Sequence, residues 1–176
     1  MHFLALVISN EKPTEALLQE WLSPFMPRKL DHWALGGRYS GLLEPLDLAD
    51  TVTGGPDCPD FELALSLHLN EGGYDMEMRG FRGSGVDALQ AKNFKRSAAT
   101  PCAVVKDGHW FEPSGEAQTS FLIESLRRDY PNAKLPPPSA EAQADIDRWD
   151  ARFRKMLSGV QPDQWFSFVD CHVSHV

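Results

Sequence analysis

The order of hydrophobic and polar residues predicts strands near both ends of the chain. Residues 2–9 form an apolar run of strand length, which is typical of a buried strand. Residues 165–173 carry apolar side chains at odd and even positions alike, as a strand covered on both faces does. Between them, residues 101–112 contain two apolar runs joined by Asp107 and Gly108, a pair that favours the type I′ turn of a β-hairpin.

A second hairpin is predicted in the middle of the chain. Apolar and polar residues alternate over residues 61–69 and again over 74–79, with glycines at the turn between them. We interpret residues 61–79 as a hairpin insertion. It follows residues 44–60, whose prolines and glycines indicate a surface loop.

Apolar residues spaced three and four apart predict helices in the remaining segments. Thr14 and Ser139 are candidate N-caps for the first and last of these helices, because their hydroxyl groups can accept a hydrogen bond from the first helical turn. The prolines of residues 131–138 indicate a stiff connector before the last helix. The predicted helices cover residues 14–25, 86–96, 116–129 and 139–158.

These elements predict a single α+β domain over residues 1–176. We expect a mainly antiparallel, mixed sheet of about six to seven strands with three to four packed helices. The N- and C-terminal strands are expected in the same sheet, so that the two ends of the chain close the domain.

Composition limits the partners. The 176 residues include 25 acidic and 17 basic side chains, a net charge of −8, which argues against nucleic acid as a partner. The apolar N-terminal run is too short to span a membrane. Three cysteines are too few and too scattered for a disulfide framework, so we expect a cytoplasmic protein.

The segment from Asp31 to Gly41 is the most distinctive stretch of the sequence. Two adjacent glycines allow the backbone to bend or to approach another group closely, and the arginine that follows can bind a carboxylate or a phosphate. We therefore expect a binding site here. Its candidate residues are Trp33, Gly36, Gly37, Arg38 and Tyr39, together with Cys171 from the C-terminal strand.

The C-terminal strand supplies candidate catalytic residues. Asp170 and His172 lie on the same face of a strand, so they can form a carboxylate–imidazole pair that serves as an acid–base centre. Cys171 points to the other face, so it cannot pair directly with His172. Alternatively, Asp170 and His172 satisfy each other as buried polar groups, with Arg38 as the first candidate partner of Asp170.

Two other segments carry partial signals for a metal site or a phosphate-binding loop. His172 and His175 with Cys171 or Asp170 could form a zinc site, but no CxxC or HExxH motif accompanies them, and we expect no metal or other cofactor. Residues 80–85 read GxxGxG, a spacing that matches neither dinucleotide-binding nor P-loop signatures. Whether this loop binds phosphate stays open.

Three motifs together resemble a family of small proteins encoded in bacteriophage and actinobacterial genomes. The family pattern contains Gly-Gly-Arg-Trp followed by glycine, an Asp-Gly-x-Trp hairpin and Val-Asp-Cys-His-Ile. Here the corresponding segments are residues 36–41, 107–110 and 169–173. The resemblance implies a mobile-element origin and no particular activity.

Two classes of function are compatible with the sequence. The first is a non-enzymatic binding protein of phage-like origin that modulates a host protein, either as a monomer or as a homodimer. The second is a small-molecule enzyme in which Arg38 binds an anionic group while Asp170 and His172 supply acid–base chemistry. The expected partner is accordingly a protein or a small anionic ligand.

Overall fold

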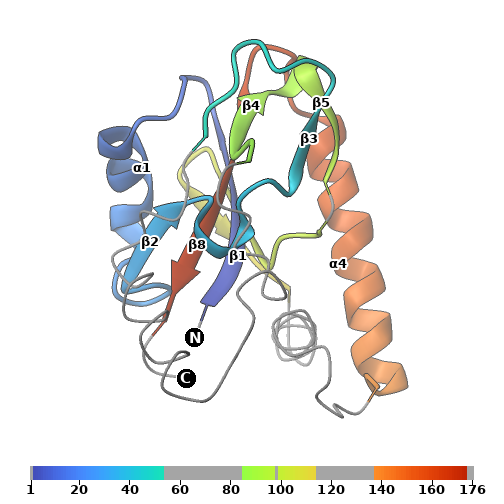
Figure 1. The fold of residues 1–176 in the computed structure, drawn as a ribbon. Coiled ribbons are helices and arrows are strands. Elements are labelled where there is room, and N and C mark those ends of the chain that lie inside the picture. The colour runs from blue at the N-terminus through green and yellow to red at the C-terminus, as the bar shows by residue number, and fades with distance from the viewer. Residues whose placement is uncertain (1, 54–84, 98, 114–136, 174–176) are drawn as a thin grey trace, which may run out of the picture.

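The described residues form an α+β fold with a six-stranded mixed sheet (Figure 1). The computed structural model describes residues 2–53, 85–97, 99–113 and 137–173. The strand order is β2-β8-β1-β6-β7, and β4 also pairs with β8. The strands are β1 (His2–Ser9), β2 (His32–Leu35), β4 (Ala88–Gln90), β6 (Ala103–Lys106), β7 (His109–Phe111) and β8 (Trp165–His172).

The first and last described strands lie in the same sheet, as the sequence predicted, and the structure makes them neighbours there. β1 and β8 pair antiparallel over their full length, from His2 opposite His172 to Ser9 opposite Trp165. On its other edge, β1 pairs parallel with β6, which makes the sheet mixed. The hairpin of β6 and β7 turns at Asp107 and Gly108, whose φ angles of 51° and 72° fit the predicted type I′ turn.

Helices cover the two faces of the sheet. α1 (Glu15–Leu22) and α4 (Ala140–Ser158) lie on opposite sides of it (Figure 1), and each has the predicted N-cap, Thr14 or Ser139. The apolar side chains of β1 alternate between the two cores. Leu4, Leu6 and Ile8 pack with Trp149 and Phe153 of α4, whereas Phe3, Ala5 and Val7 pack with Leu18 and Leu22 of α1.

Short elements surround this framework. A small second sheet pairs β3 (Leu43–Pro45) with β5 (Phe94–Ser97). Three 3₁₀ turns are described, η1 (Ser23–Phe25), η2 (Gly37–Tyr39) and η4 (Ala91–Asn93). No helix in the described part of the chain is both long and apolar enough to cross a membrane.

The prediction of a helix over residues 86–96 was wrong. This segment contains β4, η4 and β5, and its residues Ala88, Leu89 and Gln90 pair with β8. The described residues accordingly hold two α-helices, against the three to four predicted. Several predicted features lie outside the described residues. They are the helix at 116–129, the hairpin at 61–79, the loop at 80–85 apart from its last residue, residues 54–60 of the loop at 44–60, and residues 131–136 of the connector at 131–138.

Candidate histidine–aspartate site

Three histidines lie side by side across three neighbouring strands at one end of the sheet. His172, the last residue of β8, is the register partner of His2 in β1 and of His32 in β2. Because β8 runs antiparallel to both neighbours, its end meets their beginnings. The ring centroids of His32 and His172 are 4.3 Å apart and those of His2 and His172 are 4.8 Å apart, so the rings are in contact.

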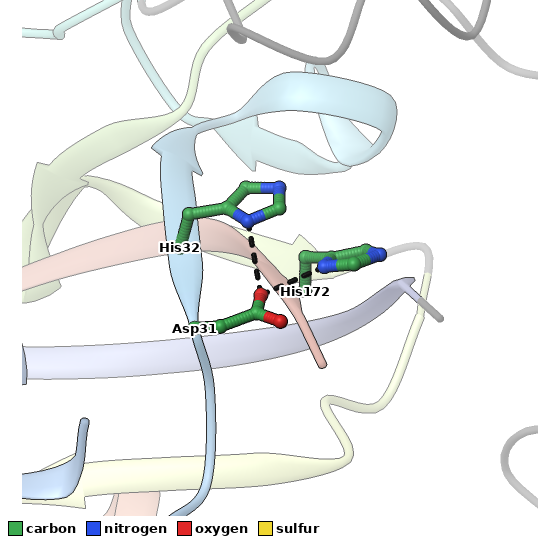
Figure 2. Close-up of side chains that lie close together, drawn as sticks. All are labelled: Asp31, His32 and His172. Atoms are coloured by element: carbon green, nitrogen blue, oxygen red, sulfur yellow. Dashed lines mark hydrogen bonds and ion pairs between the residues drawn. The ribbon is translucent and has the colours of Figure 1, made fainter. Parts of the chain in front are cut away.

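Asp31 joins two of these histidines. Its Oδ1 lies 2.7 Å from Nδ1 of His172 and 2.9 Å from Nδ1 of His32, and Figure 2 shows both imidazoles turned toward this oxygen. The backbone fixes the aspartate as well, since the Asp31 N–H donates to the carbonyl oxygen of His172 over 2.9 Å. The carboxylate is therefore held beside the end of β8.

The third histidine, His2, pairs with a different carboxylate, that of Asp170. Nδ1 of His2 lies 2.9 Å from Oδ1 of Asp170, two residues before His172 on the same face of β8. The Asp170 side chain is fully buried and that of His2 is 11% exposed. A carboxylate buried to this extent needs polar partners, and the imidazole of His2 is one of them.

Exposure differs across the cluster. The side chains of Asp31, His32 and His172 are 29%, 32% and 20% exposed, so this side of the cluster is open to solvent, while Asp170 closes the other side. Burial lowers the pKa of His172, against the hydrogen bond to Asp31, which raises it. The neutral imidazole, which is the form that binds metals, is thereby favoured.

The contacts with the carboxylates also indicate which nitrogen of each imidazole ring carries the hydrogen. An ionised carboxylate can only accept hydrogen bonds, so in the metal-free protein Asp31 requires an N–H at Nδ1 of both His32 and His172. The same holds for His2 beside Asp170. An ion bound between Oδ1 of Asp31 and Nδ1 of His32 and His172 would take the place of these N–H protons, and the remaining proton of each of the two rings would then lie on Nε2.

Asp31, His32 and His172 also have the spacing of a metal site. One ligand atom from each residue lies within 4.8 Å of the others. Bonds of about 2.0–2.2 Å place neighbouring ligands of one ion roughly 3–3.5 Å apart. The observed contacts from Asp31 to the two histidines, 2.7 and 2.9 Å, need only a small adjustment to reach that separation.

Gly36 and Gly37 pack against β8 next to the cluster. Gly36 and Gly37 have φ angles of 72° and 49°, and the Gly36 N–H donates to the carbonyl oxygen of Phe168. A Cβ atom at Gly37 would lie 2.5 Å from Cβ of Asp170. Only glycine therefore allows η2 to lie directly on the buried aspartate.

A second buried carboxylate holds the same loop in place. Asp87 is completely buried, and it accepts hydrogen bonds from the Ser40 hydroxyl over 2.9 Å and from the Gly41 N–H over 3.0 Å. A Cβ at Gly36 would lie 2.4 Å from its carboxylate. This contact explains both glycines of the Gly-Gly pair, one against Asp87 and one against Asp170.

Of the residues singled out in the sequence, Asp170 and His172 belong to the cluster, and Gly36 and Gly37 support it. The described contacts assign them different carboxylate–imidazole pairs, Asp170 to His2 and His172 to Asp31. Arg38 lies in η2, and its side chain is outside the description.

The other expected binding residues are in the cores. Tyr39 is buried on the α4 side of the sheet and Cys171 on the α1 side. Burial raises the pKa of the Cys171 thiol well above its usual range, so the thiol stays protonated. Trp33 packs against the α1 core and its indole N–H donates to Oε1 of Gln19 over 3.0 Å.

Sequence reasoning did not identify His2 and His32 as site residues, and it did not identify Asp31 as a partner of His172. The available signal was positional, since His2, His32 and His172 all stand at ends of predicted or observed strands. To use it, the pairing of β2 with β8 would have to be known.

A scan against protein-family models and searches of curated proteins and solved structures found no match to this chain.

Proposed function

We propose that this protein binds a divalent transition-metal ion through Asp31, His32 and His172. The observation that carries the proposal is the convergence of one carboxylate and two imidazoles, with one ligand atom from each within 4.8 Å of the others. The residues come from β8, β2 and the residue before β2, so the ladder between these strands organises the ligands in advance.

The donor set defines the class of ion. Two imidazole nitrogens and one carboxylate oxygen suit Zn²⁺, Fe²⁺, Co²⁺ or Ni²⁺, whereas Mg²⁺ and Ca²⁺ prefer sites built from oxygen. The lowered pKa of His172 favours its neutral imidazole over the imidazolium ion, and the neutral imidazole is the form that binds a metal ion. Zinc is the ion to test first, because it accepts this ligand set in three-ligand sites.

This proposal places the protein in the binding class and specifies the ligand, although the sequence alone led us to expect no metal. The sequence motifs imply a phage-like origin, and modulation of a host protein is the wider role we propose. Both are compatible with a metal-binding site. Binding of an anionic group by Arg38 likewise stays a proposal, separate from the metal site.

The test is metal binding to purified, chelator-treated protein. Calorimetric titration with Zn²⁺ is expected to give one ion per chain, and Co²⁺ is expected to give visible absorption bands that report nitrogen and oxygen ligands. His172→Gln and Asp31→Asn should each weaken zinc binding by at least about tenfold, a lower bound set by the loss of groups that merely orient ligands.

His109→Gln is the matched control, since His109 is an exposed histidine at the start of β7, far from the cluster in the sheet. Circular dichroism establishes that each variant is folded. If folded His172→Gln and Asp31→Asn bind zinc as the wild type does, or if the wild type shows no stoichiometric binding, the proposal is wrong.

A further inference from the structure

We propose that a second site, separate from the histidine–aspartate site, binds a guanidinium group carried on an apolar stem. The site is a cavity of about 320 Å³ lined by the end of β1, the end of α1 and the turn between β6 and β7. His2 is the first residue of β1 and the cavity lies at its last residues, so the strand separates the two sites by roughly 20 Å. The inference therefore does not depend on the proposed metal.

The sheet and α1 together form the cavity. β1 and β6 run parallel and end side by side, with Ile8 opposite Lys106 as their last pair. In open sheets covered by helices, ligands bind outside the carboxyl ends of parallel strands. Residues from the last turn of α1, Glu20 and Trp21, line the cavity on the α1 side of the sheet.

Part of the lining is apolar and firmly held. Val7 and Val105 are buried in the core on the α1 side, and Trp21 packs against the same core while remaining half-buried. Pro24 completes this part of the lining. The indole of Trp21 is therefore a fixed aromatic surface beside the cavity, on which a guanidinium plane can stack.

The charged lining residues are all acidic. Glu11, Glu20 and Asp107 come from three different segments, namely the residues after β1, α1 and the turn after β6. All three are exposed, and no ion pair or side-chain hydrogen bond within the described part of the chain occupies their carboxylates. These carboxylates are available to a ligand.

No lysine or arginine occurs among the described residues that line the cavity. Lys12 follows Glu11, but its ammonium lies over the ring of Trp165, 5.4 Å from the ring centroid. Lys106 precedes Asp107, but it is the register partner of Ile8, whose side chain belongs to the core on the α4 side of the sheet. The acidic charge of the lining is therefore not neutralised from within.

The backbone and the whole chain add to this negative field. The carbonyl end of a helix carries partial negative charge, and the last turn of α1 contains no basic side chain that would offset it. The net charge of the chain is −8. A cavity in this field favours a cation.

Geometry selects a guanidinium among the cations. A metal ion needs several ligand atoms close together, and in the described part of the chain Asp31, His32 and His172 meet that condition, whereas the three carboxylates of the cavity do not. A guanidinium has five N–H donors in one plane, so it can reach carboxylates that lie apart while its face stacks on an indole. The volume of the cavity suits a ligand of this small size. The group comes either from a free small molecule or from an arginine side chain of a partner protein.

The experiment follows the five indole N–H signals of chelator-treated protein labelled in its tryptophans, by NMR, with Trp21→Phe identifying the signal of Trp21. n-Butylguanidine is expected to shift that signal in a saturable way. n-Butylurea has nearly the same shape without the charge, and we expect it to bind at least about tenfold more weakly.

Two triple variants test the carboxylates. Glu11→Gln/Glu20→Gln/Asp107→Asn should weaken binding of n-butylguanidine at least about tenfold, as the sum of three exposed ion pairs. The matched control removes the same charge from α4, on the opposite side of the sheet (Figure 1), and should bind as the wild type does. It is Glu141→Gln/Asp147→Asn/Asp150→Asn. Circular dichroism establishes that both variants are folded.

A blocked glycine–arginine–glycine peptide and its citrulline counterpart distinguish the two sources of the group. Tighter binding of the arginine peptide than of n-butylguanidine, with loss of binding in the citrulline peptide, assigns the site to a side chain of a partner protein. Binding of n-butylguanidine without binding of the arginine peptide assigns it to a free small molecule.

Three results would overturn the inference. They are an unchanged Trp21 signal with n-butylguanidine, equal binding of n-butylurea, and wild-type binding by the folded variant that lacks the cavity carboxylates. Equal losses in the two triple variants would also overturn it, because overall charge rather than the cavity would then attract the cation. None of these results bears on zinc binding by Asp31, His32 and His172, so this inference and the proposed function fail independently.

Discussion

The backbone of Gly37 lies against the buried carboxylate of Asp170, next to the histidine–aspartate site. Its φ is 49°, and a Cβ atom there would lie 2.5 Å from Cβ of Asp170. Gly37→Ala therefore adds backbone strain to a steric clash that neither η2 nor β8 can relieve without moving. We expect it to lower the free energy of unfolding by about 2–4 kcal/mol, measured by urea denaturation.

Gly108 is the matched control for this prediction. It has a φ of 72°, also in the left-handed region, but nothing lies within 4 Å of a Cβ built on it. Gly108→Ala is expected to cost only the backbone term, about 1–2 kcal/mol. Equal losses in the two variants would show that the contact between Gly37 and Asp170 contributes nothing to stability.

His172 provides a pH-dependent term in the metal-free protein. Its pKa is lowered in the folded state, mainly by burial, so protons bind more strongly to this residue after unfolding. The stabilisation it brings is complete above its unfolded pKa of about 6.5 and is lost as the pH falls toward the lower folded value. The free energy of unfolding of the wild type should therefore fall more between pH 7.5 and pH 5.5 than that of His172→Gln. An equal fall in both proteins, in the presence of chelator, would exclude His172 as the source.

At the scale of elements, sequence periodicity was sufficient where an element is long or has a specific turn. β1 and β8 are eight residues each and strongly apolar, and α4 extends over 19 residues with a single apolar stripe. The Asp107-Gly108 turn also has a direct stereochemical cause, because both residues adopt positive φ. These features are local, so the sequence alone predicted them.

The segment at 86–96 shows where local reasoning failed. Its apolar residues, among them Val86, Leu89 and Phe94, are compatible with either a helix or short strands. Pairing of β4 with β8 and of β5 with β3 decides between them. Each strand has only three or four residues, so tertiary pairing rather than intrinsic propensity determines the outcome.

Sequence reasoning missed part of the candidate site for a similar reason. Asp170 and His172 were recognisable because they share a face of one predicted strand, a relation that the sequence contains. Asp31 and His32 join them only through the register of β2 on β8, and His2 through that of β1 on β8. Residues 31 and 172 are 141 positions apart, and sequence periodicity carries no information on such pairings.

At the scale of the whole molecule, the site lies where the two ends of the described chain meet. β8 follows β1, β2 and β4 in the sequence, yet it lies inside the sheet between β2 and β1 and also pairs with β4. The proposed ion would bind only after β8 has paired with β2, because Asp31 and His32 come from one strand region and His172 from the other. Metal binding and completion of the sheet are therefore coupled.

This coupling predicts that zinc stabilises the entire fold. A ligand that binds only the folded state adds about 2.7 kcal/mol at a free concentration 100 times its Kd. For a chain of 176 residues this corresponds to a rise in Tm of roughly 5–10 °C. We expect such a rise in calorimetry of the wild type and of His109→Gln with zinc against chelator, and none in Asp31→Asn or His172→Gln. A rise of the same size in the two ligand variants would place the stabilising zinc at a different site, and the coupling between the histidine–aspartate site and the sheet would have to be abandoned.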